Sequence, residues 1–229
     1  VVNFDDSKLT DYSSSITSSF TNASLPTPTL VSLTDGKETG RISGSSGRTI
    51  DAVDLKNQIS TAISKGTPIV TAKLVDVASP IKYTRTYTRS SDGLKDLIGQ
   101  ITAGKDIAIR YIDVNERGWD VGSNEHQQLT MASTYKLFVG YAALKRIDEG
   151  SLRMTDPVGG STFDGCIQKM IVNSDNQCSI AIGQRIGWNA IVADGKAIGA
   201  NDLNWTDDAH GSVSDCAVLL GKLARGEVL

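Results

Sequence analysis

A serine and a lysine one helical turn apart, at the start of a long apolar run, constrain this chain most. The run reads Lys136-Leu-Phe-Val-Gly-Tyr-Ala-Ala-Leu-Lys-Arg-Ile147. Its large apolar side chains recur at helical spacing, which predicts a buried helix face made of Leu137, Tyr141, Leu144 and Ile147. Ser133 and Lys136 then share one face of the first helical turn, where free backbone N–H groups favour negative charge.

A second Ser-x-x-Lys pattern, Ser79-Pro-Ile-Lys82, stands in a different context. The residues that follow, 82–89, alternate as in a strand. Positions i and i+3 of a strand face opposite sides of the sheet. Ser79 and Lys82 are therefore predicted not to meet.

The pairing of Ser133 with Lys136 is typical of a serine nucleophile beside a base. A serine hydroxyl is a weak nucleophile until a nearby base takes its proton. A lysine that loses water in a cleft gives up its proton more easily and can act as that base. The alternative is a serine that caps the helix, followed by a solvated lysine.

Composition limits the function classes. The 229 residues fit one large domain or two smaller ones, and 39% hydrophobic with 21% charged residues is ordinary for a globular protein. The formal net charge of −3 argues against general nucleic-acid binding. The chain has no long apolar stretch, so no membrane span is predicted for this segment. The opening Val1-Val-Asn-Phe predicts a mature or excised segment with an export signal or anchor upstream.

The three cysteines form no Cys-x-x-Cys pair, and the two histidines lie far apart in the sequence, so neither a zinc site nor another cofactor is expected. Cys166 and Cys178 flank Ser174-Asp-Asn176. A disulfide between them and two small buried apolar side chains are the open alternatives.

The pattern divides the chain into residues 1–90 and 91–229. The first part is predicted to be a small α+β unit. It has a Ser/Thr/Gly-rich start with little periodicity to residue 48 and turns over 35–48, then a helix over 51–64 and strands over 69–77 and 82–89. The second part begins with a helix capped by Ser91 that ends at Gly104. A hairpin follows, with strands over 106–114 and from 119 onward.

The order of helix, hairpin and Ser-x-x-Lys helix resembles the penicillin-recognising serine hydrolases, most closely the class A β-lactamase domain. The resemblance runs from about residue 91 to the end. Met131-Ala-Ser-Thr-Tyr-Lys-Leu-Phe138 is similar to that family's nucleophile segment, and Ser174-Asp-Asn176 to its second motif. Ser212-Val-Ser-Asp215, followed by residues 219–226, resembles its late helix. The implied fold is α+β, a helical cluster beside an antiparallel sheet.

The resemblance also implies roles. Ser133 would be the acylated nucleophile and Lys136 its proton acceptor or relay. Ser174 would pass a proton toward the leaving nitrogen, and Asn176 would hold Lys136 and the substrate amide. The backbone N–H of Ser133 would supply half of an oxyanion hole, a donor worth about 3–4 kcal/mol. For Ser174-Asp-Asn176 the alternative is an ordinary turn and N-cap between two helices.

The chain departs from the family's pattern in three places. The Lys-Thr-Gly strand is absent, so the hairpin is expected to be the domain's only sheet, and missing strands are expected beyond Leu229 or from another chain. The connection from Ser133 to Ser174 is short, with a compact stretch over 151–162. Leu203-Asn204 fits the pair that follows the deacylating glutamate, but the glutamate position holds Ala200.

A missing base would leave an acyl-enzyme on Ser133 unhydrolysed, which favours a slow hydrolase, a peptidase or an inactive relative. A shortened loop that brings Asp202, Asp207 or Asp208 to the site is the alternative.

In the first part, Gly44-Ser-Ser-Gly-Arg-Thr-Ile50 and the helix after it resemble a small peptidoglycan-binding module found beside cell-wall enzymes. A spacer is the alternative there.

Three functions follow as hypotheses. The first is a serine hydrolase of the β-lactamase and penicillin-binding protein superfamily that opens β-lactams. The second is a D-alanyl-D-alanine peptidase or transpeptidase acting on peptidoglycan stem peptides. The third is a non-catalytic peptidoglycan-binding protein on the same scaffold. All three imply an exported bacterial protein of the cell envelope or the extracellular space.

Overall fold

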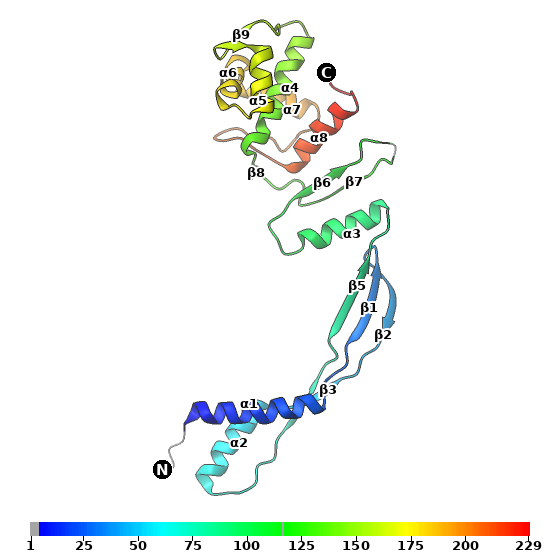
Figure 1. Ribbon diagram of the computed structural model, residues 1–229, viewed down its shortest axis with the longest axis vertical. Helices are drawn as coiled ribbons and strands as arrows, with labels where there is room; N and C mark the ends of the chain where they lie inside the picture. Colours follow the sequence, from blue (N-terminus) through cyan, green and yellow to red (C-terminus); the bar gives the residue numbers. More distant parts are fainter. Residues whose placement is uncertain (1–4, 116) are drawn as a thin grey trace. The chain divides into compact units, whose positions relative to one another are not determined.

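The computed structural model describes residues 5–115 and 117–229, without the side chains of residues 21–23. The chain divides into two compact units, unit 1 up to Thr88 and unit 2 from Arg89 (Figure 1). Each unit has buried apolar residues of its own.

Unit 1 combines helices with short strands. Its described residues form α1 (Asp6–Ala23), β1 (Thr29–Thr34), β2 (Lys37–Ile42), β3 (Gly47–Ile50), α2 (Ala52–Lys65), β4 (Leu74–Val77) and β5 (Ile81–Thr86). In the sheet β2-β1-β5, β1 runs antiparallel to β2 and parallel to β5, while β3 and β4 pair antiparallel. Asp35 and Gly36 both have positive φ, 49° and 74°, which suits the tight turn between β1 and β2, within the stretch predicted as turns.

Helix α1 contradicts the expectation of little periodicity before residue 48. Leu9, Ile16 and Phe20 are spaced for one helix face, and Leu9 is buried. The Asp5 carboxylate accepts the Ser7 backbone N–H at 2.9 Å, as an N-terminal cap does. Sparse apolar residues among many Ser and Thr made this helix hard to predict.

Helix α2 confirms its sequence signals. Asp51 accepts the Asp54 backbone N–H at 3.0 Å, and Gly66 closes the helix at φ 67°. Leu55 and Ala62 are buried. The strand predicted over 69–77 is confined to β4, the last four residues of that range.

Gly44 and Gly47, the two glycines of the predicted peptidoglycan-binding pattern, stand where backbone segments approach closely. A Cβ on Gly44 would lie 2.1 Å from the Thr27 carbonyl oxygen, and one on Gly47 would lie 2.2 Å from the Ser24 carbonyl oxygen. The two glycines therefore let two backbone segments approach closely. Nearby, the Ser79 hydroxyl donates to the same Thr27 oxygen at 2.8 Å, which assigns Ser79 a structural contact.

Unit 2 is mostly helical. Its described residues form α3 (Ser91–Thr102), β6 (Ile109–Ile112), β7 (Asp120–Ser123), β8 (Leu129–Thr130), η1 (Ala132–Thr134), α4 (Tyr135–Asp148), β9 (Pro157–Val158), β10 (Ser161–Thr162), α5 (Phe163–Val172), α6 (Asn176–Ile186), α7 (Trp188–Ala197), β11 (His210–Gly211) and α8 (Val213–Ala224). The predicted hairpin β6–β7 lies between α3, which packs on β7, and α8, which packs on β6 (Figure 1).

Two further strand pairs, β8–β11 and β9–β10, correct the expectation that the hairpin is the only β-structure of this part. The β8–β11 pair has a consequence for the site. It joins His210–Gly211 to the strand just before the Ser133 segment, and the Met131 backbone N–H donates to the Ala209 oxygen at 2.8 Å. The 201–209 loop is thereby attached beside the predicted nucleophile.

Helix α4 is the centre of unit 2, with α5, α6 and α7 packed around it. Its most buried side chains are Phe138, Val139, Ala142 and Ala143, all at 0% exposure. In the predicted face, Tyr141 is buried, whereas Leu137, Leu144 and Ile147 are half-buried. The predicted face is therefore only part of the buried surface: Tyr141 belongs to the core, and Leu137 and Ile147 pack against it. Neighbours surround the helix, and a helix that is apolar on most sides is buried on most sides.

Helix caps fix the remaining boundaries. Ser90, rather than the predicted Ser91, caps α3 by accepting the Gly93 backbone N–H at 3.0 Å. Ser212 and Asp215 form a capping box at the start of α8, the predicted late helix. None of the described helices is long and apolar enough to cross a membrane.

Candidate active site

The four predicted site residues come together in one hydrogen-bonded cluster. Ser133 lies in the 3-10 turn η1 that runs into α4, and Lys136 is one turn further along. Ser174 and Asn176 come from the loop between α5 and α6 and from the first residue of α6. Segments about 40 positions apart in the chain therefore meet at one point, although their catalytic roles remain predictions.

Lys136 Nζ is the hub of the cluster. It donates to the Ser174 carbonyl oxygen at 2.6 Å, Asn176 Oδ1 at 2.6 Å, Ser174 Oγ at 2.9 Å and Ser133 Oγ at 3.3 Å. An ammonium has three N–H donors, so four oxygen neighbours compete and the most distant, Ser133 Oγ, is held least tightly. Lys136 is 2% exposed and makes no ion pair within the described residues.

The two hydroxyls complete a triangle with this nitrogen. Ser174 Oγ donates to Ser133 Oγ at 3.0 Å, and each hydroxyl is within hydrogen-bond distance of Lys136 Nζ. Ser133 and Ser174 are exposed, whereas the lysine beneath them is buried. A substrate can therefore reach the hydroxyls while the nitrogen is shielded from water, an arrangement suited to proton transfer.

The backbone is strained on both sides of this triangle. Ala132 has φ 46° and Ser174 has φ 55°, in the left-handed region that side chains with a Cβ seldom adopt. Each such residue costs about 1–3 kcal/mol and persists only where the surroundings enforce it. Asp175 supplies part of that enforcement, because its carboxylate accepts the Cys178 backbone N–H at 2.8 Å and caps α6. The motif is thus a turn and N-cap as well as part of the cluster.

A disulfide joins Cys166 of α5 to Cys178 of α6, with 5.0 Å between their Cα atoms. The structure thereby resolves the two alternatives for these cysteines in favour of the bond. The bond clamps the two helices on either side of the Ser174 loop. Cys216 is free, and burial raises the pKa of its thiol.

Ser133 opens into a cavity of about 350 Å³ whose other walls are mainly apolar side chains. Its lining consists of Met131, Ala132, Ser133, Thr134, Lys136, Leu137, Met170, Ile171 and Ser174. No carboxylate is part of this lining. A hydroxyl nucleophile with a buried amine and apolar walls suits attack on a carbonyl carbon in a partly desolvated space.

The structure shows where the residues considered for the deacylating role lie. Ala200, at the position expected to hold the glutamate, is fully buried. Asp202 is already engaged, with Oδ2 2.7 Å from His126 Nδ1 and accepting the Ser212 hydroxyl at 2.8 Å. Burial acts to raise the pKa of Asp202, but these hydrogen bonds outweigh it and hold the pKa below its ordinary value. This carboxylate therefore has a structural partner set of its own.

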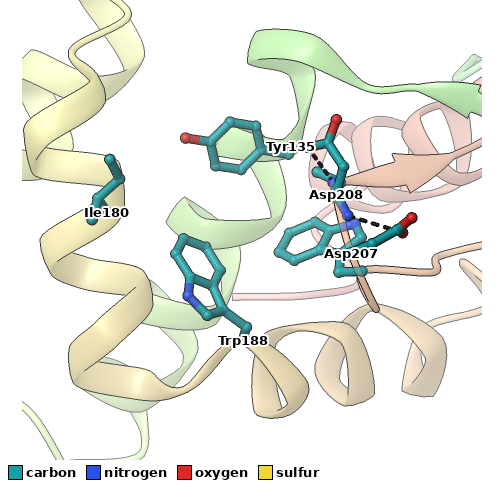
Figure 2. A pocket seen from close by; sticks show the side chains of 7 residues that line it. Tyr135, Ile180, Trp188, Asp207 and Asp208 are labelled. Carbon is teal, nitrogen blue, oxygen red and sulfur yellow. Dashed lines mark hydrogen bonds between the residues drawn. The ribbon is translucent and has the colours of Figure 1, made fainter.

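Asp207 and Asp208 border a second cavity, of about 280 Å³, instead of the one at Ser133. Figure 2 shows this second cavity with the side chains around it, which are Tyr135, Ile180, Trp188, Trp205, Asp207, Asp208 and Ala209. The two linings have no residue in common. The sequence did not predict the aromatic residues of this second cavity, because they come from three separate segments.

Residues 90–229 match the model of the Beta-lactamase enzyme family. No curated protein matches the chain. Among solved structures, a beta lactamase from Xanthomonas campestris pv. campestris is 19% identical with a TM-score of 0.52, over 62% of this chain and 66% of that one. A D-alanyl-D-alanine carboxypeptidase from Francisella tularensis is 19% identical with a TM-score of 0.45, over 59% of this chain and 42% of that one.

The chain thus spans just under two thirds of the first protein and less than half of the second. The likeness to the Xanthomonas protein shows a common fold, which confirms the predicted mixed α+β architecture. The family match covers more than half of the chain and includes η1, α4 and the Ser174 loop. Through residues 90–229, the chain belongs to the beta-lactamase enzyme family.

Proposed function

We propose that this protein is a serine hydrolase that opens β-lactam amides through an acyl-enzyme on Ser133. The triangle of Ser133 Oγ, Lys136 Nζ and Ser174 Oγ, with sides of 2.9–3.3 Å, is the observation that carries the proposal. It provides a nucleophile, a base and a proton relay in mutual contact. Membership of the beta-lactamase enzyme family supports the same reaction class.

In the proposed first step, the neutral form of Lys136 takes the Ser133 hydroxyl proton directly or through Ser174. Ser133 Oγ attacks the β-lactam carbonyl carbon, the new C–O bond forms, and the ring C–N bond breaks. Ser174 delivers the proton to the leaving nitrogen, which balances the step. Asn176 accepts from Lys136 through Oδ1, so its amide N–H₂ is available to donate to the substrate carbonyl.

The second step, hydrolysis of the acyl-enzyme, needs an activated water. No carboxylate lines the Ser133 cavity, and Asp202 is held by His126 and Ser212. We therefore expect slow deacylation by these residues. That observation favours a second candidate, a D-alanyl-D-alanine peptidase or transpeptidase, which would use the same first half-reaction and pass the acyl group to another acceptor.

Intact-mass spectrometry after exposure to benzylpenicillin tests the first step. We expect the mass of one intact penicillin to be added to the protein and the addition to be lost in Ser133→Ala. Ser79→Ala, the serine of the other Ser-x-x-Lys pattern, serves as the matched control and keeps the adduct. A folded wild-type protein that gains no mass would favour the third hypothesis, a non-catalytic wall-binding protein.

Turnover separates the two catalytic candidates. Steady hydrolysis of a chromogenic cephalosporin supports the β-lactamase reaction. A stoichiometric burst without further turnover, together with release of D-alanine from a stem-peptide substrate, supports the peptidase.

We also propose an exported location in the bacterial cell envelope or outside the cell, supported by the Cys166–Cys178 disulfide, because such bonds persist in oxidising compartments. Fractionation of cells that express the full-length protein checks this location, and recovery in the cytoplasm contradicts it.

Peptidoglycan binding by unit 1 is a further part of the proposal. Co-sedimentation with purified peptidoglycan, with and without residues 1–88, distinguishes it from a spacer.

A further inference from the structure

The second cavity is built from three aromatic rings in mutual contact. Tyr135 comes from α4, Trp188 from the start of α7, and Trp205 from the loop before β11. Their ring centroids lie 5.9–6.4 Å apart in edge-to-face arrangements. Aromatic faces carry negative partial charge, so a site made of several rings attracts a cation.

Two carboxylates stand at the edge of these rings (Figure 2). Asp207 and Asp208 are exposed, and neither forms an ion pair within the described residues. Asp207 Oδ1 accepts the Asp208 backbone N–H at 3.0 Å, and Asp208 Oδ1 accepts the Ala209 backbone N–H at 2.7 Å. These bonds orient the carboxylates, and each retains a second oxygen for a ligand.

The cavity is connected to the candidate active site through hydrogen bonds. Tyr135 directly precedes Lys136, and its hydroxyl lies 2.7 Å from Ser179 Oγ. Ser179 Oγ in turn donates to the Asn176 carbonyl oxygen at 2.9 Å. A group bound in this cavity would therefore contact Tyr135, at the same helix start that positions Lys136.

We propose that this cavity binds an alkylammonium group. The combination of three rings with two carboxylates that form no ion pair within the described residues favours a cation over a neutral apolar group, which would gain nothing from either charge. A volume of about 280 Å³ suits a side group rather than an entire substrate. Resting on the proposed function, the inference extends to the substrate class, which is an acyl donor that carries an amine.

Binding of a simple probe tests the site without any catalysis. Tetramethylammonium is titrated into the full-length protein at constant ionic strength, with tryptophan fluorescence as the readout and tert-butanol as the neutral probe of similar shape. We expect saturable binding of the cation alone. Asp207→Asn combined with Asp208→Asn should weaken it roughly fivefold or more.

Asp92→Asn combined with Asp164→Asn is the matched control, because it removes two exposed carboxylates outside the cavity and should leave binding unchanged. Trp188→Leu should weaken binding without changing charge. Equal responses to the cation and to tert-butanol, or equal affinity in the two double variants, would overturn the proposal.

Acylation links the cavity to the substrate. Ampicillin carries a primary ammonium that benzylpenicillin lacks. The rate of acylation by ampicillin divided by the rate of acylation by benzylpenicillin therefore reports on the cavity. We expect this ratio to fall in the Asp207→Asn/Asp208→Asn variant and to persist in the control variant; an unchanged ratio refutes the substrate inference. If neither penicillin acylates the wild-type protein, the proposed function fails, whereas cation binding in the titration would still stand.

Discussion

Lys136 is the residue whose environment is most unusual for its type. It is 2% exposed, and its ammonium is surrounded by uncharged oxygens instead of a carboxylate, within the part of the chain that the structure describes. Burying an amine in this way costs free energy unless hydrogen bonds compensate. Such a cost at a position that also contacts two serine hydroxyls is expected if Lys136 serves the proposed reaction at the expense of stability.

Lys136→Met should separate these two properties. Methionine has a similar length and removes the buried amine, so the free energy of unfolding should stay the same or rise by about 1–2 kcal/mol. Acylation by benzylpenicillin should slow by about 10²–10⁴-fold, because the proton acceptor is lost. Urea unfolding and timed intact-mass measurements give the two quantities. Lys169→Met, an exposed lysine of α5, is the control, and wild-type acylation by Lys136→Met would show that Lys136 is not the base.

Among the secondary-structure elements, α4 and α7 are joined by a buried carboxylate. Asp194 of α7 accepts Lys145 Nζ at 2.6 Å and Arg146 Nη1 at 2.5 Å, both from the last turn of α4. Burial acts to raise the pKa of Asp194, but the hydrogen bonds from Lys145 and Arg146 outweigh it and the pKa is lowered. The charged form of this aspartate therefore stabilises the folded state.

The sign of this pKa shift sets the pH dependence. Because the folded pKa lies below the unfolded value of about 3.9, the stabilisation is complete above that value and is lost as the pH falls through the folded pKa. Asp194→Asn should lower the free energy of unfolding by about 2 kcal/mol at neutral pH. The gap to wild type should narrow steadily below about pH 4. Urea unfolding across pH measures it, with exposed Asp148→Asn as the control, and a gap that is independent of pH contradicts the assignment.

Across the whole molecule, sequence reasoning succeeded where the signal was local. The α2 helix, the β6–β7 hairpin and the helical Ser133–Lys136 pair follow from caps, turn residues and spacing over a few positions. It failed for α1, whose apolar residues are sparse, and it found only part of the buried surface of α4, which tertiary neighbours decide. The aromatic cavity depends on Tyr135, Trp188 and Trp205 meeting in space, which no single window of sequence contains.

The division into two units yields a further expectation. Leu55 of α2 is 4% exposed in unit 1, and Leu219 of α8 is fully buried in unit 2. Leu55→Ala should destabilise unit 1 by about 2–4 kcal/mol through the cavity it leaves, while acylation of Ser133 continues at the wild-type rate. Leu219→Ala is the matched change in unit 2 and should lower the stability of the unit that holds the site. Scanning calorimetry and intact mass follow both effects, and loss of acylation in Leu55→Ala would show that the units are coupled.

The left-handed backbone at Ala132 and Ser174 bears on how this site can vary among descendants of the sequence. Glycine, asparagine and aspartate adopt such φ values at least cost, whereas branched side chains are nearly excluded. Glycine would remove the strain but would also make the chain beside Ser133 more pliable. Few substitutions are therefore tolerated at these two positions. A change to glycine that stabilised the fold by relieving the strain would also hold Ser133 less rigidly.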